Sequence, residues 1–285
     1  MAAQQENWRK FEGRTEGFDY DGPALQQNWT RLHIGDREPY PDAAYLDMLV
    51  EKHPVLKPDA PIAEAADTLQ KAWRAYHRGD FQEAFQLGRS LGLLGANVAN
   101  KAEAIQATYL EHDKETKLAM FHDAAQRAED LQKAAPELVN AWYLYAQALG
   151  RYAQGISIAK ALAEGYGGKV KGALERALAI EPKHADANIA LGAYHANVVH
   201  KIGALAARLT YGASKEAAVE HYEAALKLNP GSAVARIEAA NGLAMLFGKS
   251  KLADATKLYE EAARCEPADA MEWLDVELAK SELAA

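Results

Sequence analysis

Polar residues recur along two stretches of the chain at spacings that could build a binding surface. In the first stretch the steps are three or four residues, through Gln147, Arg151, Gln154, Ser157, Lys160 and Glu164. On an α-helix such steps keep the side chains on one face. The second stretch offers Asn197, Lys201 and Arg208, and His195 and His200 lie close to the same line.

Four of these residues are cationic in a chain whose formal net charge is −8. If the two stretches face one groove, Arg151, Lys160, Lys201 and Arg208 would attract a carboxylate, a phosphate or an acidic peptide. Every amphipathic helix also has a solvated polar face, and this is the commoner explanation of each stripe taken alone.

The patterns that metal binding and catalysis require are missing. His195 and His200 are five residues apart, about 140° around a helix, which suits joint ligation poorly. The sequence has no H-E-x-x-H and no cluster of Cys and His. It also lacks G-x-S-x-G, the P-loop pattern and G-x-G-x-x-G after a strand. We therefore expect no metal, no other cofactor and no enzymatic activity.

Composition limits the partners and the compartment. The 32 Lys and Arg against 40 Asp and Glu argue against nucleic-acid binding, which needs basic surface. The single cysteine, Cys265, excludes an internal disulfide. No run of eighteen apolar residues and no signal-like apolar stretch at the start occur. We expect a cytoplasmic protein without membrane insertion.

The elements that must position these residues are helices. From residue 62 onward Ala and Leu dominate, and apolar residues recur at three and four. Similar Ala-rich stretches end at Pro136, Pro182, Pro230 and Pro267, which are 46, 48 and 37 residues apart. Self-similarity at this spacing is typical of stacked helical hairpins. The sequence predicts an all-α, superhelical solenoid of αα-hairpins over residues 62–285.

The stretch 1–61 has a different character. It holds six of the ten prolines and many turn-forming residues, with one short helix expected from Asp42 to Lys52. Aromatic residues such as Trp8, Phe11 and Phe18 make it too apolar for a solvated tail. We expect an extended N-terminal arm that these aromatics anchor on the helical body.

The repeat resembles the tetratricopeptide repeat (TPR) over roughly residues 62–283. The segment Gly79-Asp-Phe-Gln-Glu-Ala84 matches the turn between the two helices of a repeat. Gly192 with Ala218, Tyr222, Ala225 and Pro230 supplies most of another repeat. The resemblance implies that the first helix of each hairpin lines a concave groove that binds ligands.

Asn241 becomes a candidate through the same resemblance. In TPR domains similar to this one, an Asn directly after the small residue of the first helix can clamp a peptide carboxylate. Here that small residue is Ala240, but Gln147 and Ala193 at the matching positions of the preceding repeats break the full clamp pattern.

The repeats are longer than usual, and the extra residues are expected to lengthen the first helices near 138–164 and 185–210. This layout resembles the regulator-of-microtubule-dynamics proteins and the T-components of tripartite (TRAP) transporters. The resemblance implies their architecture and neither of their cellular roles.

We expect a non-catalytic scaffold that holds a protein segment in the groove. The alternative is an accessory subunit that binds a small anionic ligand in a cavity between the long helices. Apolar surface on these helices would also favour a homo-oligomer.

Overall fold

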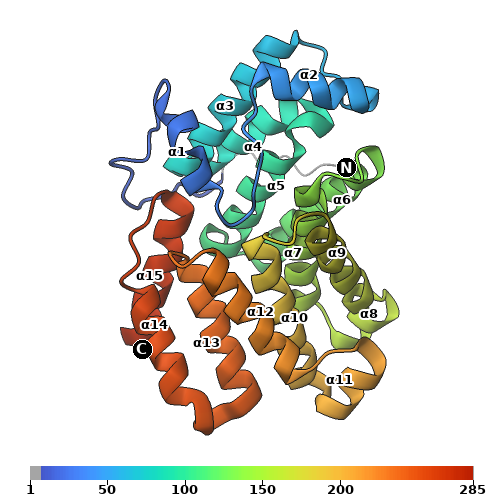
Figure 1. Ribbon diagram of the computed structural model, residues 1–285, viewed down its shortest axis with the longest axis vertical. Coiled ribbons are helices and arrows are strands. Elements are labelled where there is room, and N and C mark those ends of the chain that lie inside the picture. The colour runs from blue at the N-terminus through green and yellow to red at the C-terminus, as the bar shows by residue number, and fades with distance from the viewer. Residues whose placement is uncertain (1–7, 285) are drawn as a thin grey trace. The chain divides into compact units, whose positions relative to one another are not determined.

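The computed structural model describes residues 8–284 and, within that range, consists of helices joined by turns and loops (Figure 1). The all-α architecture predicted above is confirmed. In chain order the elements are α1 (Ala24–Leu32), α2 (Ala43–Lys52), η1 (Pro54–Leu56), α3 (Ile62–Arg78), α4 (Phe81–Ser90), η2 (Gly92–Gly95), α5 (Ala96–Ile105), η3 (Gln106–Leu110), α6 (Lys114–Ala134), α7 (Val139–Gly155), α8 (Ile158–Ala163), α9 (Tyr166–Ile180), α10 (Ala185–Ile202), α11 (Ala204–Tyr211), α12 (Lys215–Leu228), α13 (Ala233–Phe247), η4 (Gly248–Lys251), α14 (Leu252–Ala262) and α15 (Ala270–Ala284).

The chain divides into two compact units, each built from separate segments. Unit 1 comprises the described residues up to Trp29 together with Pro39–Gly155 and Asp269–Met271. Unit 2 comprises Thr30–Glu38, Ile156–Ala268 and the residues from Glu272 onward. Unit 1 therefore holds residues on both sides of the boundary expected near residue 61.

Helical hairpins build unit 1, with α3 packed on α4 and α6 packed on α7. The turn after α3 is made by Gly79, whose φ of 99° lies in the left-handed region that glycine adopts without strain. Phe81 and Ala84 of α4 and Ala72 of α3 are buried, as the repeat pattern predicts. The turn expected at residues 79–84 is therefore present.

The first part of the chain contains two α-helices rather than one. The expected helix is α2, whose N-cap Asp42 accepts a hydrogen bond from the Tyr45 backbone N–H. The second, α1, was not foreseen. Its residues Leu25 and Trp29 are buried, and Trp29 meets Trp73 edge to face at 5.7 Å in unit 1.

Unit 2 packs its hairpins around an aromatic side chain held between two glycines. A Cβ atom at Gly192 of α10 would lie 2.8 Å from the Tyr222 ring of α12, and one at Gly242 of α13 would lie 2.4 Å from it. Only glycine leaves this space, so α10, α12 and α13 approach closely. At the end of the unit, Ile237, Ala262 and Val276 join α13, α14 and α15 in one apolar cluster.

The two long helices predicted near 138–164 and 185–210 are interrupted. The first is divided into α7 and α8, because Ser157 caps a new helix by accepting a hydrogen bond from the Lys160 N–H. The second is divided into α10 and α11 at Gly203, because its φ of 80° is incompatible with a continuous α-helix. The extra residues of each repeat therefore form short additional helices.

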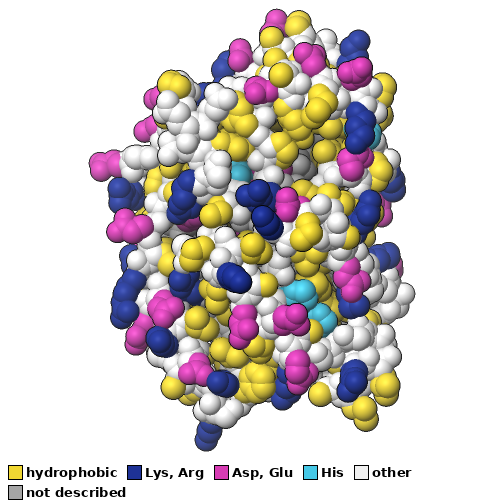
Figure 2. Space-filling view, viewed as in Figure 1, with side chains coloured by type: hydrophobic (Ala, Val, Ile, Leu, Met, Phe, Trp, Pro, Cys, Tyr) yellow, Lys and Arg dark blue, Asp and Glu magenta, His cyan; other side chains and the backbone are white. Residues whose placement is uncertain are grey.

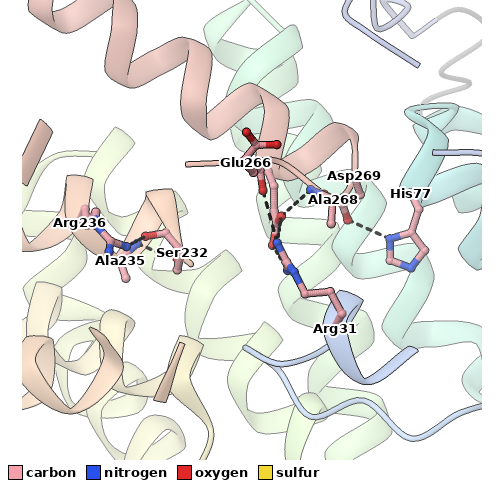
Figure 3. A network of polar contacts seen from close by, with 9 residues as sticks. Arg31, His77, Ser232, Ala235, Arg236, Glu266, Ala268 and Asp269 are labelled. Atoms are coloured by element: carbon pink, nitrogen blue, oxygen red, sulfur yellow. Dashed lines mark hydrogen bonds and ion pairs between the residues drawn. The ribbon is translucent and has the colours of Figure 1, made fainter. Parts of the chain in front are cut away.

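Polar contacts, buried in unit 1 and more exposed in unit 2, join the segments that each unit takes from distant parts of the chain (Figure 3). In unit 1, His77 Nδ1 lies 2.8 Å from the Asp269 carboxylate, and both side chains are buried. In unit 2, Arg31 donates two hydrogen bonds of 2.8 Å to the Glu272 carboxylate. One Glu272 oxygen also accepts from the Ala268 N–H, just before α15 begins.

Candidate binding surface

The residues predicted as a single site belong to both units. Gln147, Arg151 and Gln154 lie on α7 in unit 1. Lys160, Asn197, Lys201, Arg208 and Asn241 lie in unit 2, on α8, α10, α10, α11 and α13 respectively. Each set is therefore described within its own unit.

In unit 1 the polar face of α7 is partly covered. Gln154 is exposed, whereas Gln147 and Arg151 are half-buried. The side-chain carbonyl oxygen of Gln147 is buried and accepts no hydrogen bond. Burying an acceptor in this way is unfavourable, so this position could gain from a donor supplied by a ligand.

In unit 2 the two asparagines already make hydrogen bonds inside the protein. The Asn197 amide donates to the Ala193 carbonyl at 2.8 Å, and the Asn241 carbonyl oxygen accepts from the Tyr259 hydroxyl at 2.7 Å. The second bond joins α13 to α14. Asn241 thus has a packing role here that a carboxylate clamp does not require.

The predicted cations of unit 2 lie among exposed apolar side chains. Leu205 and Leu209 of α11 are 75% and 78% exposed, and Ile158 and Leu162 of α8 are also exposed. Each pair is four residues apart, so it forms an apolar stripe along its helix. We call these residues, with the exposed cations beside them in sequence, the α8/α11 surface: Ile158, Lys160, Leu162, Lys201, Leu205, Arg208 and Leu209.

Helix α9 supports both short helices. Helix α8 packs on α9, and Tyr211 at the end of α11 packs on Gly167 in the first turn of α9, where a Cβ would lie 3.1 Å from the ring. Figure 2 shows hydrophobic side chains at the surface where Figure 1 places α11. The apolar stripe of α11 is thus held on a folded base and faces solvent.

The charge around this surface differs from that of the whole chain. Residues 187–214 contain Lys201 and Arg208 and no Asp or Glu, although the protein carries −8 overall. A locally cationic region with exposed leucines favours a partner that is both acidic and apolar. Lone exposed leucines would be ordinary, but paired stripes on two helices are not.

A histidine pair in unit 2 was missed by sequence reasoning. The rings of His195 on α10 and His221 on α12 stack 5.7 Å apart with an angle of 10° between their planes. His195 Nδ1 accepts from the Ser214 N–H at 3.3 Å, and His221 Nδ1 lies 2.9 Å from the Asn188 carbonyl oxygen. The assigned proton is therefore on Nε2 in His195 and on Nδ1 in His221.

Both imidazoles are neutral at pH 7. Burial, with smaller contributions from His221 and Lys171, lowers the pKa of His195 to about 4. Burial also lowers the pKa of His221. The repeat contains a signal for this pair. Gly192 and Ala218 are the small residues where α10 and α12 pack closely, and each histidine lies three residues after one of them.

Two other kinds of site find no support in the described part of the chain. Within residues 8–284 no three His, Cys, Asp or Glu side chains are grouped as metal ligands. None of the helices described is both long enough and apolar enough to cross a membrane.

Comparison with known proteins identifies the family. A family model described as "Regulator of microtubule dynamics protein 1-3" matches residues 68–282, more than half of the chain. The chain belongs to this family. The match also confirms the resemblance drawn from the repeat.

One solved structure places this family member among TPR folds. A thermophilic TPR protein of Thermus thermophilus, TTC0263, is 14% identical, covers 76% of this chain and 99% of its own, and has a TM-score of 0.55. YrrB, titled a TPR protein with an unusual peptide-binding site, is 14% identical over 84% of this chain and 99% of its own, with a TM-score of 0.40. The first similarity confirms the predicted αα-hairpin solenoid. No curated protein sequence matches the chain.

Proposed function

We propose that this member of the regulator-of-microtubule-dynamics family is a non-catalytic binding protein whose α8/α11 surface holds an acidic, apolar segment of a partner protein. The observation that carries the proposal is the pair of leucines on α11, more than 70% exposed and next to Lys201 and Arg208. Asn197 on α10, and the polar face of α7 with Gln147, Arg151 and Gln154, are proposed as further partner contacts.

The size of the surface suits reversible binding. Fully burying one Leu or Ile side chain contributes about 1.5–3 kcal/mol, and the α8/α11 surface exposes four such side chains. Association and side-chain ordering oppose much of this gain. A net affinity in the micromolar range, about −8 kcal/mol, needs the cationic residues as well. The cations also speed the encounter with an acidic partner, and salt should weaken that effect.

The test compares partner capture by matched variants of the full chain. Leu205→Glu with Leu209→Glu removes the apolar stripe, and Lys201→Glu with Arg208→Glu reverses the local charge. The control is Met48→Glu with Val55→Glu, because these unit 1 side chains are also exposed, at 59% and 66%.

A partner retained by the wild type and by the control, and lost by both variants of the α8/α11 surface, supports the proposal. Charge reversal should weaken capture most at low salt. If both variants of the α8/α11 surface retain every partner of the wild type, this surface is not the binding site.

A further inference from the structure

The N-terminal arm lies on unit 1 in the manner of a bound peptide. Residues 8–22 contain no helix, and side chains of the helical body donate hydrogen bonds to their backbone carbonyls. The Gln106 amide donates to the Arg9 carbonyl at 3.1 Å. The Arg74 guanidinium donates to the carbonyls of Tyr20 and Gly22, both at 3.1 Å. Contacts of this kind hold any extended chain, whatever its sequence.

Two aromatic anchors three residues apart give the contact its specificity. The Trp8 ring packs on Phe85 of α4 at 4.8 Å and is almost fully buried. Phe11 meets Phe81 edge to face at 6.2 Å and lies against Gly79, where a Cβ atom would come within 2.3 Å of its ring. An aromatic side chain in a fitted recess is a typical anchor of peptide recognition.

The recess under Trp8 is built from polar groups as well. Guanidinium groups of Arg127 and Arg89 lie 5.2 and 5.5 Å from the Phe85 ring centre. Arg127 is fixed by hydrogen bonds of 3.0 and 3.1 Å to Glu103, which is buried. Gln106, which holds the arm backbone, begins the π-helical turn η3, an irregularity that is frequent at functional sites.

The arm is also a weakly held part of unit 1. It lacks the cooperative hydrogen bonds of a helix or sheet, so it should open more easily than the helices beneath it, although Phe18 is buried as well as Trp8. The anchors, the backbone donors and the extended backbone are features that a bound peptide ligand would also have.

We propose that the surface formed by α3, α4 and η3 under residues 8–22 is a recognition site for an extended partner peptide. Such a peptide carries two aromatic side chains three residues apart, as Trp8 and Phe11 are. The arm occupies the site as an internal competitor that the partner displaces. This site is independent of the α8/α11 surface.

The test uses the full chain and a fluorescent synthetic peptide of residues 8–22. In the wild type the arm is present at an effective concentration of about 1 mM and competes with the probe. The variant Trp8→Ala with Phe11→Ala weakens the arm and frees the site. It should bind the probe about a hundredfold more tightly than the wild type. A probe with the same two substitutions should not bind.

Hydrogen exchange on the wild type gives a second measurement that needs no variant. The amides of the arm should exchange by local opening, at least a hundredfold faster than those buried in α3 and α4. Exchange of the arm only by global unfolding would overturn the proposal. A folded arm-weakened variant that does not bind the probe would overturn it too. Dimerisation of the wild type that this variant abolishes would assign the site to a second copy's arm instead.

Discussion

In unit 1, Phe81 and Phe85 are covered by residues 8–22 of the same chain, whereas in unit 2 Leu205 and Leu209 face solvent. Both units are stacks of helical hairpins, so the fold does not explain the difference. The difference follows from segments added to the repeats. An extended arm covers one surface, and short added helices expose apolar side chains on another.

The buried polar groups of the two units differ as well. Unit 1 buries an ion pair, Glu103 with Arg127, in the recess that receives Trp8. Unit 2 buries the neutral pair His195 and His221. A buried ion pair needs both partners to balance its desolvation, while a buried imidazole needs only to stay unprotonated.

The largest effect should come from breaking the ion pair. Arg127→Met leaves the Glu103 carboxylate buried without its partner, and at pH 8 this should cost about 3–5 kcal/mol of unfolding free energy. Urea denaturation measures the loss. The double variant Arg127→Met with Glu103→Gln should recover much of it. A loss below about 1 kcal/mol in the single variant would show that Glu103 avoids an unpaired buried charge, by taking up a proton or by contact with water.

Glu103 of unit 1 and His195 of unit 2 should contribute to the pH dependence of stability with opposite signs. Burial raises the pKa of Glu103 to about 7, although Arg127 opposes this, so its contribution to stability falls as pH rises from 4.5 to 7. The pKa of His195 is lowered to about 4, so its contribution is lost as pH falls from 6.5 to 4, by up to about 3 kcal/mol.

Denaturation between pH 4 and 8 tests this contrast with two variants, in each of which the titratable side chain is replaced by one that does not titrate. His195→Asn should flatten the loss below pH 6.5, and Glu103→Gln should flatten the loss above pH 4.5. If the slope below pH 6.5 is the same with and without His195, its burial does not control the stability of unit 2.

A smaller effect should separate the arm from its base. Gly79→Ala introduces a methyl group where φ is 99° and where Phe11 already lies, so both the turn and the arm should suffer. Gly92→Ala is the matched control, since its φ is 60° and no atom lies within 4 Å of the added carbon. Each change should cost about 1 kcal/mol through the backbone.

Only Gly79→Ala should also accelerate trypsin cleavage in the arm, at Arg9, Lys10 and Arg14. Equal cleavage rates in the two glycine variants would mean that Phe11 does not depend on Gly79.

The smallest effect is expected at the uncovered surface. Leu205→Gln with Leu209→Gln should change the unfolding free energy by less than about 0.5 kcal/mol per site, because these side chains are exposed in the folded chain. Thermal denaturation measures this at several protein concentrations. A loss above about 2 kcal/mol that grows with concentration would show that another copy covers the leucines.

Sequence patterns located the repeat and several helix ends but not the tertiary contacts. Asp42 as a helix start and the turn at Gly79 were readable, because caps and turns are local. Ser157 was interpreted as part of a polar stripe. A Gly followed two residues later by a Ser can also end one helix and provide the N-cap of the next. The spacing of the polar residues predicts one continuous helix, whereas N-capping by Ser157 predicts a second helix. The structure has the capped second helix.

The buried charges show where the sequence carries too little information. A charged residue on an amphipathic helix normally marks the solvated face, yet Lys101 and Glu103 of α5 are both buried. Their partners come from other helices: Lys101 lies 6.0 Å from the Trp73 ring centre, and Glu103 pairs with Arg127. Only the packing of α3, α5 and α6 brings these groups together, and no spacing within α5 encodes it.

The contact between His77 and Asp269 has a consequence for the synthesis of the protein. The two residues are 192 positions apart, and both belong to unit 1. A ribosome adding about 5–20 residues per second needs about 10–40 s to pass from one to the other. During that interval the nascent chain carries His77 without its carboxylate, and most of unit 2 is made before unit 1 receives its last segment. Unit 1, although it begins first, is completed only after Asp269 has been added to the chain.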